Sequence, residues 1–161
     1  MPSSTPVSTL TELEQEITAY WVEVATAFGF PRSSGEIFGV LFVSPTPLTA
    51  DDIVAHLGMS RSGVGQGLKS LLEMGAIRPA SVVATRKDHF EPQTDLGVLV
   101  RRFLSSRVLP QLDEFSRRRA ALGETARKQA SVHLTARFDK LDRWSGKTKP
   151  LLSILKALAK E

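Results

Sequence analysis

Two short helices joined by a tight turn, within residues 49–75, constrain the fold more than any other feature of this sequence. Thr49 is a typical helix N-cap residue, and Gly58 is a typical helix stop. Ser60 caps a second helix, in which apolar residues recur at helical spacing until Gly75 ends it. This order of caps and stops predicts a helix-turn-helix.

The second of these helices contains the segment "SRSGVGQGLKS", which resembles a phosphate-binding loop. That motif requires Gly, four residues and then Gly-Lys-Ser/Thr. Gly63 and Lys69-Ser70 match its ends, but Leu68 occupies the place of the second glycine, where a Cβ obstructs the tight turn. The segment also follows a predicted helix, whereas the motif follows a strand. We therefore interpret residues 60–74 as a helix.

A basic hairpin is expected directly after the two helices. The segments "AIRPASVV" and "HFEP" have the character of two short antiparallel strands, and the turn "ATRKD" lies between them. A hairpin in this position makes the helix-turn-helix a winged one. Arg86 and Lys87 stand at the tip of this wing, residues 84–89, where they would reach the minor groove or flanking phosphates. The alternative is that both residues serve only solubility.

Further helices are expected on both sides of this motif. The segment "GEIFGVLFVS" is apolar on nearly all sides, which predicts the central buried helix. The expected fold class is mainly α: a winged helix-turn-helix domain with a two-stranded wing and N- and C-terminal dimerisation helices. Its parts are a disordered tail at 1–8, an N-terminal dimerisation helix at 9–30, the winged helix-turn-helix domain at 31–93 and a C-terminal helical dimerisation region at 94–161.

Local signals predict where the outer helices begin and end. Thr9 and Glu12 match a capping box that would open the first helix, and Pro31 is expected in the first turn of the second. In the C-terminal region the expected boundaries are a helix start at Thr94, a kink or break at Pro110, a helix end at Gly123, a helix through Ala130 to Leu141, and a last helix set off by Gly146 and Pro150.

The polar side of the helix at 60–74 carries the candidate DNA contacts. At 100° per residue, this side lies opposite an apolar face of Val64, Leu68 and Leu71. Gln66 can bond adenine bidentately, while arginine or lysine can reach guanine or phosphate, and serine hydroxyls near the helix start can bond phosphate. The expected DNA-binding residues are Ser60, Arg61, Ser62, Gly65, Gln66, Lys69, Arg86 and Lys87.

Three glycines interrupt this helix at alternate positions. Relative to alanines, Gly63, Gly65 and Gly67 together cost the helix roughly 2–3 kcal/mol. Close approach of the backbone to DNA, or to the preceding helix, would rationalise that cost. The alternative is a poorly formed helix that enters no groove.

Charge is distributed unevenly along the chain. The first thirty residues contain four glutamates and no lysine or arginine, whereas residues 101–161 carry 15 basic and 6 acidic side chains, a net of +9. The asymmetry predicts an anionic partner, an internal match between the acidic and basic segments, or both. Solvated helix faces are the alternative.

Other classes of function find little support in the residues. The absence of cysteine excludes disulfides and thiolate metal sites, and His56, His89 and His133 are too scattered to indicate a metal pair. Asp51 and Asp52 fall in the first turn of a helix, whose dipole explains them better than acid–base catalysis does. We expect a protein that is not an enzyme and that binds no cofactor or metal. We also expect it to be cytoplasmic and to make no membrane contact, because it lacks a signal sequence and a span of about 20 apolar residues.

Three segments together resemble the glycine-betaine synthesis repressor-like (GbsR-like) branch of the MarR superfamily. They are "FGFPRSSGEIFGVLFVS", "PLTADDIVAHLGMSRSGVGQGLKSLLEMGAIR" and "TRKDHFEPQTD", and the similarity covers roughly residues 10–118. The resemblance implies a homodimeric repressor or activator that binds double-stranded DNA and whose two copies are joined by their first and last helices. Of the two directions of regulation, we expect repression. Glu36 departs from the basic residue that the branch often has there, so no role is carried over to that position.

The resemblance also implies a small-molecule effector. Some members of the branch sense choline-like cations, which an aromatic cage would bind by cation–π attraction. The candidate effector residues lie on helices that should meet near a dimer junction, and they are Tyr20, Trp21, Phe28, Phe38, Phe42 and Phe103. Ordinary core packing is the alternative for these rings.

Two further functions remain open at this stage. Apolar, basic C-terminal helices could make the winged fold a protein–protein adaptor that grips an acidic partner. The sequence pI of about 9.7 also allows a non-specific nucleoid-binding protein.

Overall fold

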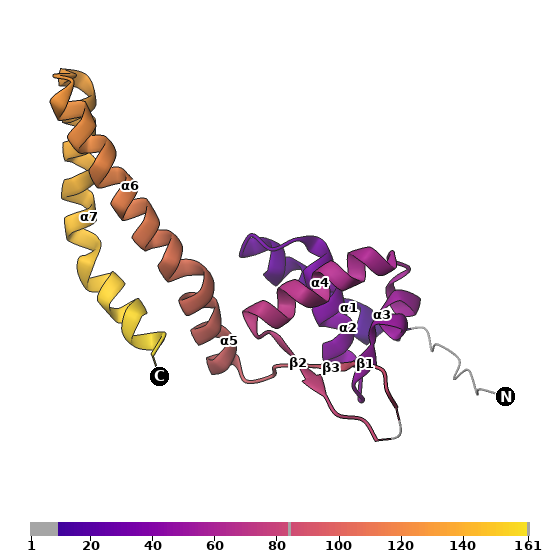
Figure 1. Cartoon of the computed structure of the whole chain (residues 1–161). Coiled ribbons are helices and arrows are strands. Elements are labelled where there is room, and N and C mark those ends of the chain that lie inside the picture. The colour runs from indigo at the N-terminus through magenta and orange to yellow at the C-terminus, as the bar shows by residue number, and fades with distance from the viewer. Residues whose placement is uncertain (1–9, 84, 161) are drawn as a thin grey trace. The chain divides into compact units, whose positions relative to one another are not determined.

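The computed structural model describes residues 10–83 and 85–160, which divide into two compact units, Met1–Leu96 and Gly97–Glu161 (Figure 1). The tail expected at 1–8, Thr9 and Ala84 of the wing lie outside the described residues. The first unit contains helices α1 (Glu12–Ala27), α2 (Arg32–Val43), α3 (Ala50–Leu57) and α4 (Arg61–Met74), and strands β1 (Leu48–Thr49), β2 (Ile77–Ala80) and β3 (His89–Pro92).

The first helix begins later than expected. Thr11 is its N-cap, and a capping box joins Thr11 to Glu14: the Thr11 amide donates to a Glu14 carboxylate oxygen at 2.7 Å. The prediction of a box between Thr9 and Glu12 was therefore wrong. Both pairs satisfy the same Thr-x-x-Glu pattern, so the pattern could not choose between them. Pro31 stands at the N-cap of α2, one position before the first turn.

Helix α2 is the buried centre of the first unit, as its sequence predicted. Ile37, Val40 and Leu41 are almost fully buried. Gly35 and Gly39 lie where α2 crosses α1: a Cβ at position 35 would meet Val22 Cα at 2.6 Å, and one at position 39 would meet backbone atoms at 2.8 Å. The two glycines therefore let the helix backbones approach closely.

The helix-turn-helix is confirmed at α3 and α4. Thr49 caps α3 in a box with Asp52, whose carboxylate accepts from the Thr49 amide at 2.8 Å. Ser60 caps α4 by accepting from the Gly63 amide at 3.1 Å. Gly58 ends α3 in the left-handed conformation at φ +63°, which a glycine adopts without strain. Gly75 ends α4 in the same way.

Among the described residues the sheet contains both strands expected for the wing, β2 and β3, and a third strand, β1, that the sequence did not predict. Its order is β1-β3-β2, and both pairs are antiparallel, with Leu48 opposite Phe90 and Ile77 opposite Pro92. β1 is only two residues long, so it offers no alternation by which a sequence pattern could reveal it. It ties the segment before α3 to the base of the wing.

The second unit consists of α5 (Leu96–Phe103), a π-helical turn η1 (Leu104–Val108), α6 (Leu109–Lys128) and α7 (Val132–Leu158). The sequence predicted a kink or a break at Pro110; the helical backbone runs from α5 through η1 into α6, so no break occurs there. A π-turn directly before a proline accommodates its missing N–H and its ring. The Ser106 hydroxyl donates to the Arg102 carbonyl at 2.6 Å within this turn.

Three further boundaries in this unit were predicted wrongly. Gly123 lies inside α6 rather than at its end; it is buried, and a Cβ there would make ordinary van der Waals contact with Phe138 of α7 at 3.4 Å. The turn falls instead at Ala130, at φ +53°. Gly146 and Pro150 both lie within α7, which continues through them. α6 and α7 lie side by side as an antiparallel pair (Figure 1).

Candidate nucleic-acid interface

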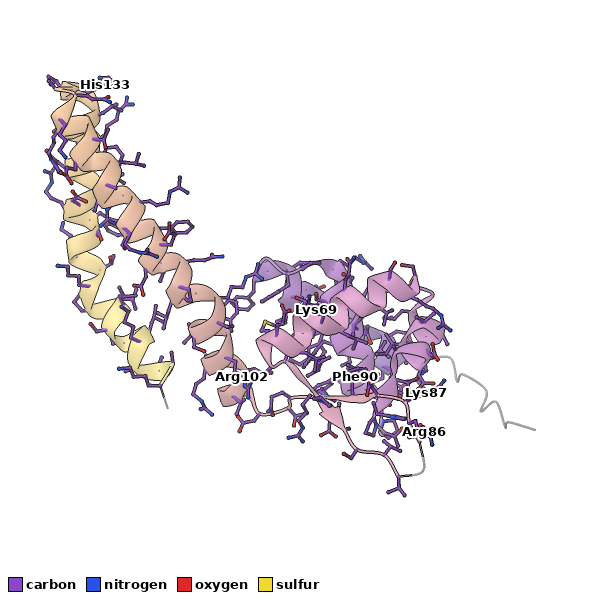
Figure 2. The ribbon with its side chains drawn as sticks, in the orientation of Figure 1. Lys69, Arg86, Lys87, Phe90, Arg102 and His133 are labelled. Atoms are coloured by element: carbon purple, nitrogen blue, oxygen red, sulfur yellow. The ribbon has the colours of Figure 1, made fainter. Side chains whose placement is uncertain are left out.

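Helix α4 separates its apolar and polar residues as the sequence predicted. Val64, Leu68 and Leu71 are buried. The expected contact residues on this helix, Ser60, Arg61, Ser62, Gly65, Gln66 and Lys69, are all exposed. Lys69 pairs loosely with Glu73 one turn later, at 3.9 Å, and its side chain stays 79% exposed (Figure 2). This side of α4 is therefore open to a partner.

The three glycines of α4 have different surroundings. A Cβ on Gly67 would collide with the Cδ1 atom of Ile37, so that glycine lets α4 pack closely on α2. A Cβ on Gly63 would lie 3.1 Å from the Oγ atom of Ser60, the cap residue of the same helix. Gly65 has no described atom within 4 Å of its Cβ position. Packing within the described chain therefore gives no reason for glycine at position 65.

The start of α3 links α4 to the wing. Lys87 Nζ donates to Asp51 Oδ2 at 2.9 Å, and the Arg61 guanidinium lies 3.0 Å from Asp51 Oδ1. One carboxylate thus holds two of the cations expected to contact DNA. Sequence reasoning missed this link, because Asp51 and Lys87 are 36 residues apart and the helix dipole already accounted for an aspartate at that position.

The wing presents both of its basic residues at the surface. Arg86 and Lys87 are exposed in the segment between β2 and β3, and Figure 2 shows them next to one another. The Lys87 amide donates to the Thr85 hydroxyl at 3.2 Å, and the Lys87 carbonyl lies 2.8 Å from the His89 ring nitrogen Nδ1. These local bonds shape the turn that carries the two cations.

The electrostatics of the α3 start favour ionised carboxylates. The hydrogen bond from Lys87, followed by the charge of Arg61, lowers the pKa of Asp51 below its ordinary value of 3.8. Burial raises the pKa of Asp52, but the bonds from the hydroxyl and amide of Thr49, together with the nearby His89 and His56, lower it by more, so its net pKa is also depressed. Both side chains are therefore negatively charged at neutral pH.

The candidate effector residues only partly converge. Trp21 packs against Phe38 and Phe42 with ring centroids 4.6 and 5.2 Å apart, and Tyr20 lies 5.3 Å from Trp21. Phe38 is buried, whereas Tyr20 and Phe42 are partly exposed. Within the described residues, the buried Nε1 atom of Trp21 has no hydrogen-bond partner.

The other two candidate rings belong to other parts of the chain. Phe28 follows the end of α1 as its C-cap residue and is exposed. Phe103 belongs to the second unit, at the end of α5. The structure thus brings four of the six expected effector residues together.

The second unit combines paired charges with exposed apolar residues. Arg127 reaches Asp139 at 2.8 Å and Asp142 at 3.4 Å across the α6–α7 pair, and Arg119 reaches Asp142 at 3.0 Å. Part of the basic charge expected to meet a partner is therefore used within the unit. Large apolar side chains nevertheless remain at the surface, and they include Phe115, Leu122, Leu141, Trp144, Leu151 and Ile154.

Comparisons with known proteins found similarity to regulators of transcription. Over 90 residues the chain is 23% identical to YvaV, which is named among the HTH-type transcriptional regulators of Bacillus subtilis (strain 168). Over 91 residues it is 20% identical to the HTH-type transcriptional repressor OpcR of the same organism. Each match covers 56% of this chain, and the chain spans about half the length of these relatives, 51% and 49%. No protein-family model matches the chain.

A solved structure supports the fold over nearly the whole chain. The crystal structure of a transcriptional regulator superposes with a TM-score of 0.60, at 16% sequence identity, over 92% of this chain and 99% of the other. This similarity establishes a mainly helical fold of the winged-helix regulator type. Of the described residues, none forms a helix that is both long and apolar enough for a membrane span.

Proposed function

We propose that this chain is a sequence-specific, DNA-binding transcriptional regulator. The observation that carries the proposal is the exposed polar side of α4, which is capped by Ser60, backed by a buried apolar face and followed by a basic wing. In this proposal α4 enters the major groove, and Arg86 and Lys87 contact the minor groove or flanking phosphates. The relatives named above support the proposal, since both are helix-turn-helix regulators.

We further propose a repressor of the GbsR-like branch of the MarR superfamily, acting in the cytoplasm. The assignment to this branch rests on the three sequence segments quoted above. The name of OpcR, a repressor, supports the direction of regulation.

Dimerisation is part of the proposal, with helices at 9–30 and 94–161 joining two copies around the winged domain at 31–93. Exposed apolar residues support it: Leu13 and Tyr20 on α1 are 65% and 57% exposed, and Phe115 and Trp144 on the second unit are 63% and 66% exposed. Surfaces of this kind are typical of protein interfaces. Sedimentation of the full chain at micromolar concentration should give a dimer, and a monomer would count against this part.

For the effector we propose a small organic cation bound beside Trp21. Its neighbours Tyr20 and Phe42 offer partly exposed ring faces, which attract cations. The buried indole N–H of Trp21, which has no partner among the described residues, would donate to an oxygen of a ligand that reaches it. Titration of choline and glycine betaine into a Trp144→Phe variant should change the fluorescence of Trp21, and an unchanged signal in both titrations would remove this part of the proposal.

A gel-shift titration tests the proposed regulator. The full chain is titrated against DNA upstream of its own and neighbouring genes and against random duplexes of equal length. We expect at least one upstream fragment to bind far more tightly than the random duplexes. Equal affinity for every duplex would instead favour non-specific nucleoid binding, since specificity is the ratio between the two affinities.

The exposed apolar residues of α6 and α7 support a second candidate, a protein–protein adaptor. An adaptor would show no DNA affinity even at low salt, where phosphate contacts are strongest. It would also retain a protein partner at high salt, because apolar contacts survive screening.

A further inference from the structure

The carboxylate of Asp51 lies between two cations that the proposed function assigns to DNA contacts. Arg61 comes from the first position of α4, and Lys87 comes from the wing, yet each lies within 3.0 Å of a different oxygen of this one side chain. The side chains of Arg61 and Lys87 remain 81% and 65% exposed, and that of Asp51 is 42% exposed. All three groups can therefore be reached by a charged partner.

The fold itself does not require a carboxylate at position 51. The N-cap of α3 is completed by Thr49 and Asp52, which satisfy one another's polar groups. The start of α4 is capped separately by Ser60. Asp51 contributes a first-turn charge to the dipole of α3, but its two oxygens are directed to the cations of α4 and the wing.

We propose that Asp51 is an electrostatic brake on DNA binding, an inference that rests on the proposed function. Phosphates and Asp51 compete for the same two cations, so a phosphate contact by Arg61 or Lys87 requires an ion pair to Asp51 to be broken. The freed carboxylate then lies among phosphates and repels them. Because phosphates are common to all duplexes, the brake acts on every sequence and leaves the choice of bases to α4.

The opposite role would be preorganisation, in which the ion pairs of Asp51 hold Arg61 and Lys87 in place for DNA and so strengthen binding. The structure favours the brake over this role. Ion pairs between exposed side chains contribute little to holding elements in place, because solvent and salt screen them. The wing is held independently by the pairing of β3 with both β1 and β2. Removal of the Asp51 charge should therefore free the cations without displacing the wing.

The test measures the binding of the full chain to a fluorescein-labelled random-sequence duplex by anisotropy over a series of NaCl concentrations. Asp51→Asn keeps the shape of the side chain and removes its charge. We expect this variant to bind the duplex roughly threefold to tenfold more tightly than the wild type at low salt. Its plot of log affinity against log salt should be steeper by about one to two, since more counterions are released.

Two further variants separate local charge from other effects. Glu114→Gln makes the same change in net charge at a place distant in the sequence. It frees Arg117 from a surface ion pair of 2.6 Å within α6. This variant should bind the duplex as the wild type does. Asp51→Glu keeps the charge and should also resemble the wild type. Thermal melting of each variant verifies that it is folded.

The outcomes distinguish the brake from the proposed function. If the wild type binds the duplex and folded Asp51→Asn binds equally or more weakly, the brake is wrong and DNA binding still stands. If Asp51→Glu tightens binding as much as Asp51→Asn does, the cause is not charge and the brake is likewise wrong. If no variant binds any duplex at low salt, both the brake and the proposed function are wrong.

Discussion

Gly39 of α2 packs directly against Thr18 of α1: a Cβ at position 39 would lie 2.8 Å from Thr18 Cα and 2.9 Å from its Cγ2. Thr18 is itself buried, and its hydroxyl donates to the Glu14 carbonyl at 2.8 Å. Neither the backbone of α1 nor this bonded side chain can move freely away. The contact sets how closely α1 and α2 approach one another.

Gly39→Ala should therefore destabilise the first unit. A methyl group at this point forces α1 and α2 apart, and overpacking of this kind costs about 1–3 kcal/mol. Urea denaturation followed by far-UV circular dichroism measures the loss. A midpoint equal to that of the wild type would show that the helix crossing is looser than the structure indicates.

Gly65→Ala should have the opposite effect on stability. The Cβ meets no described atom, and alanine is better than glycine inside a helix by about 0.8–1.0 kcal/mol. In the proposed complex, however, Gly65 faces the groove, and the added methyl group obstructs close approach to DNA. We expect a higher melting temperature together with DNA binding weakened about tenfold, a loss of about 1.4 kcal/mol. Unchanged DNA affinity would show that position 65 does not approach the duplex.

Replacement of both wing cations, Arg86→Ala with Lys87→Ala, should weaken binding to all duplexes by a similar factor. Contacts to phosphate carry no base information, and each one lost reduces the salt slope by about one. Anisotropy titrations on an upstream fragment and a random duplex, each over several salt concentrations, measure both quantities. A double variant that binds as the wild type does would contradict the proposed docking of the wing.

Gln66→Ala should instead change which bases are preferred. A bidentate bond from glutamine to adenine contributes about 1–3 kcal/mol of discrimination at one base pair. The expected result is a selective loss of affinity for the preferred fragment, with little change in affinity for random duplexes. Competition among fragments that differ at single base pairs locates the position affected, and a uniform loss across all fragments would assign Gln66 to the phosphates.

The cap of α3 should make stability depend on acidic pH. The folded-state pKa of Asp52 lies below its ordinary value of 3.8, because the bonds from Thr49, together with the nearby His89 and His56, outweigh the effect of burial. A depressed pKa means that the carboxylate contributes stability above about pH 4 and that the contribution is lost as the pH falls through the folded-state value. The gap in melting temperature between the wild type and Asp52→Asn should therefore be widest at neutral pH and narrow below about pH 4.

A control and a contrary result complete the pH prediction. Asp88→Asn, at an exposed position in the wing, should show a gap that varies little over the same range. A gap between the wild type and Asp52→Asn that stays constant as the pH falls would show that the charge of Asp52 does not stabilise the cap.

Local chemistry made the helix-turn-helix predictable. Thr49, Gly58, Ser60 and Gly75 act within their own helix turns, through hydrogen bonds and backbone conformations that span a few residues. The division of α4 into a buried face and an exposed face follows from helical periodicity alone. For these reasons the sequence by itself determined the helices of the motif and the side chains that they expose.

Where several local solutions were possible, the sequence was insufficient. Thr9 and Thr11 begin equivalent capping patterns, and only the structure selects Thr11. Gly123 and Pro110 have the character of helix ends, yet Gly123 lies inside α6 beside Phe138 of α7, and a π-helical turn leads from α5 into α6 ahead of Pro110. Neighbouring helices supply the stabilisation that overrides such local preferences.

Contacts between residues distant in the sequence were decided by the tertiary structure alone. Gly65 and Gly67 are the same residue type two positions apart, but Ile37 lies against only one of them. Asp51 meets Lys87 across 36 residues, in a geometry that depends on how α3 and the wing pack together. Helical periodicity and capping act over a few residues, whereas ion pairs and steric contacts depend on distance in space, which the folded chain alone establishes.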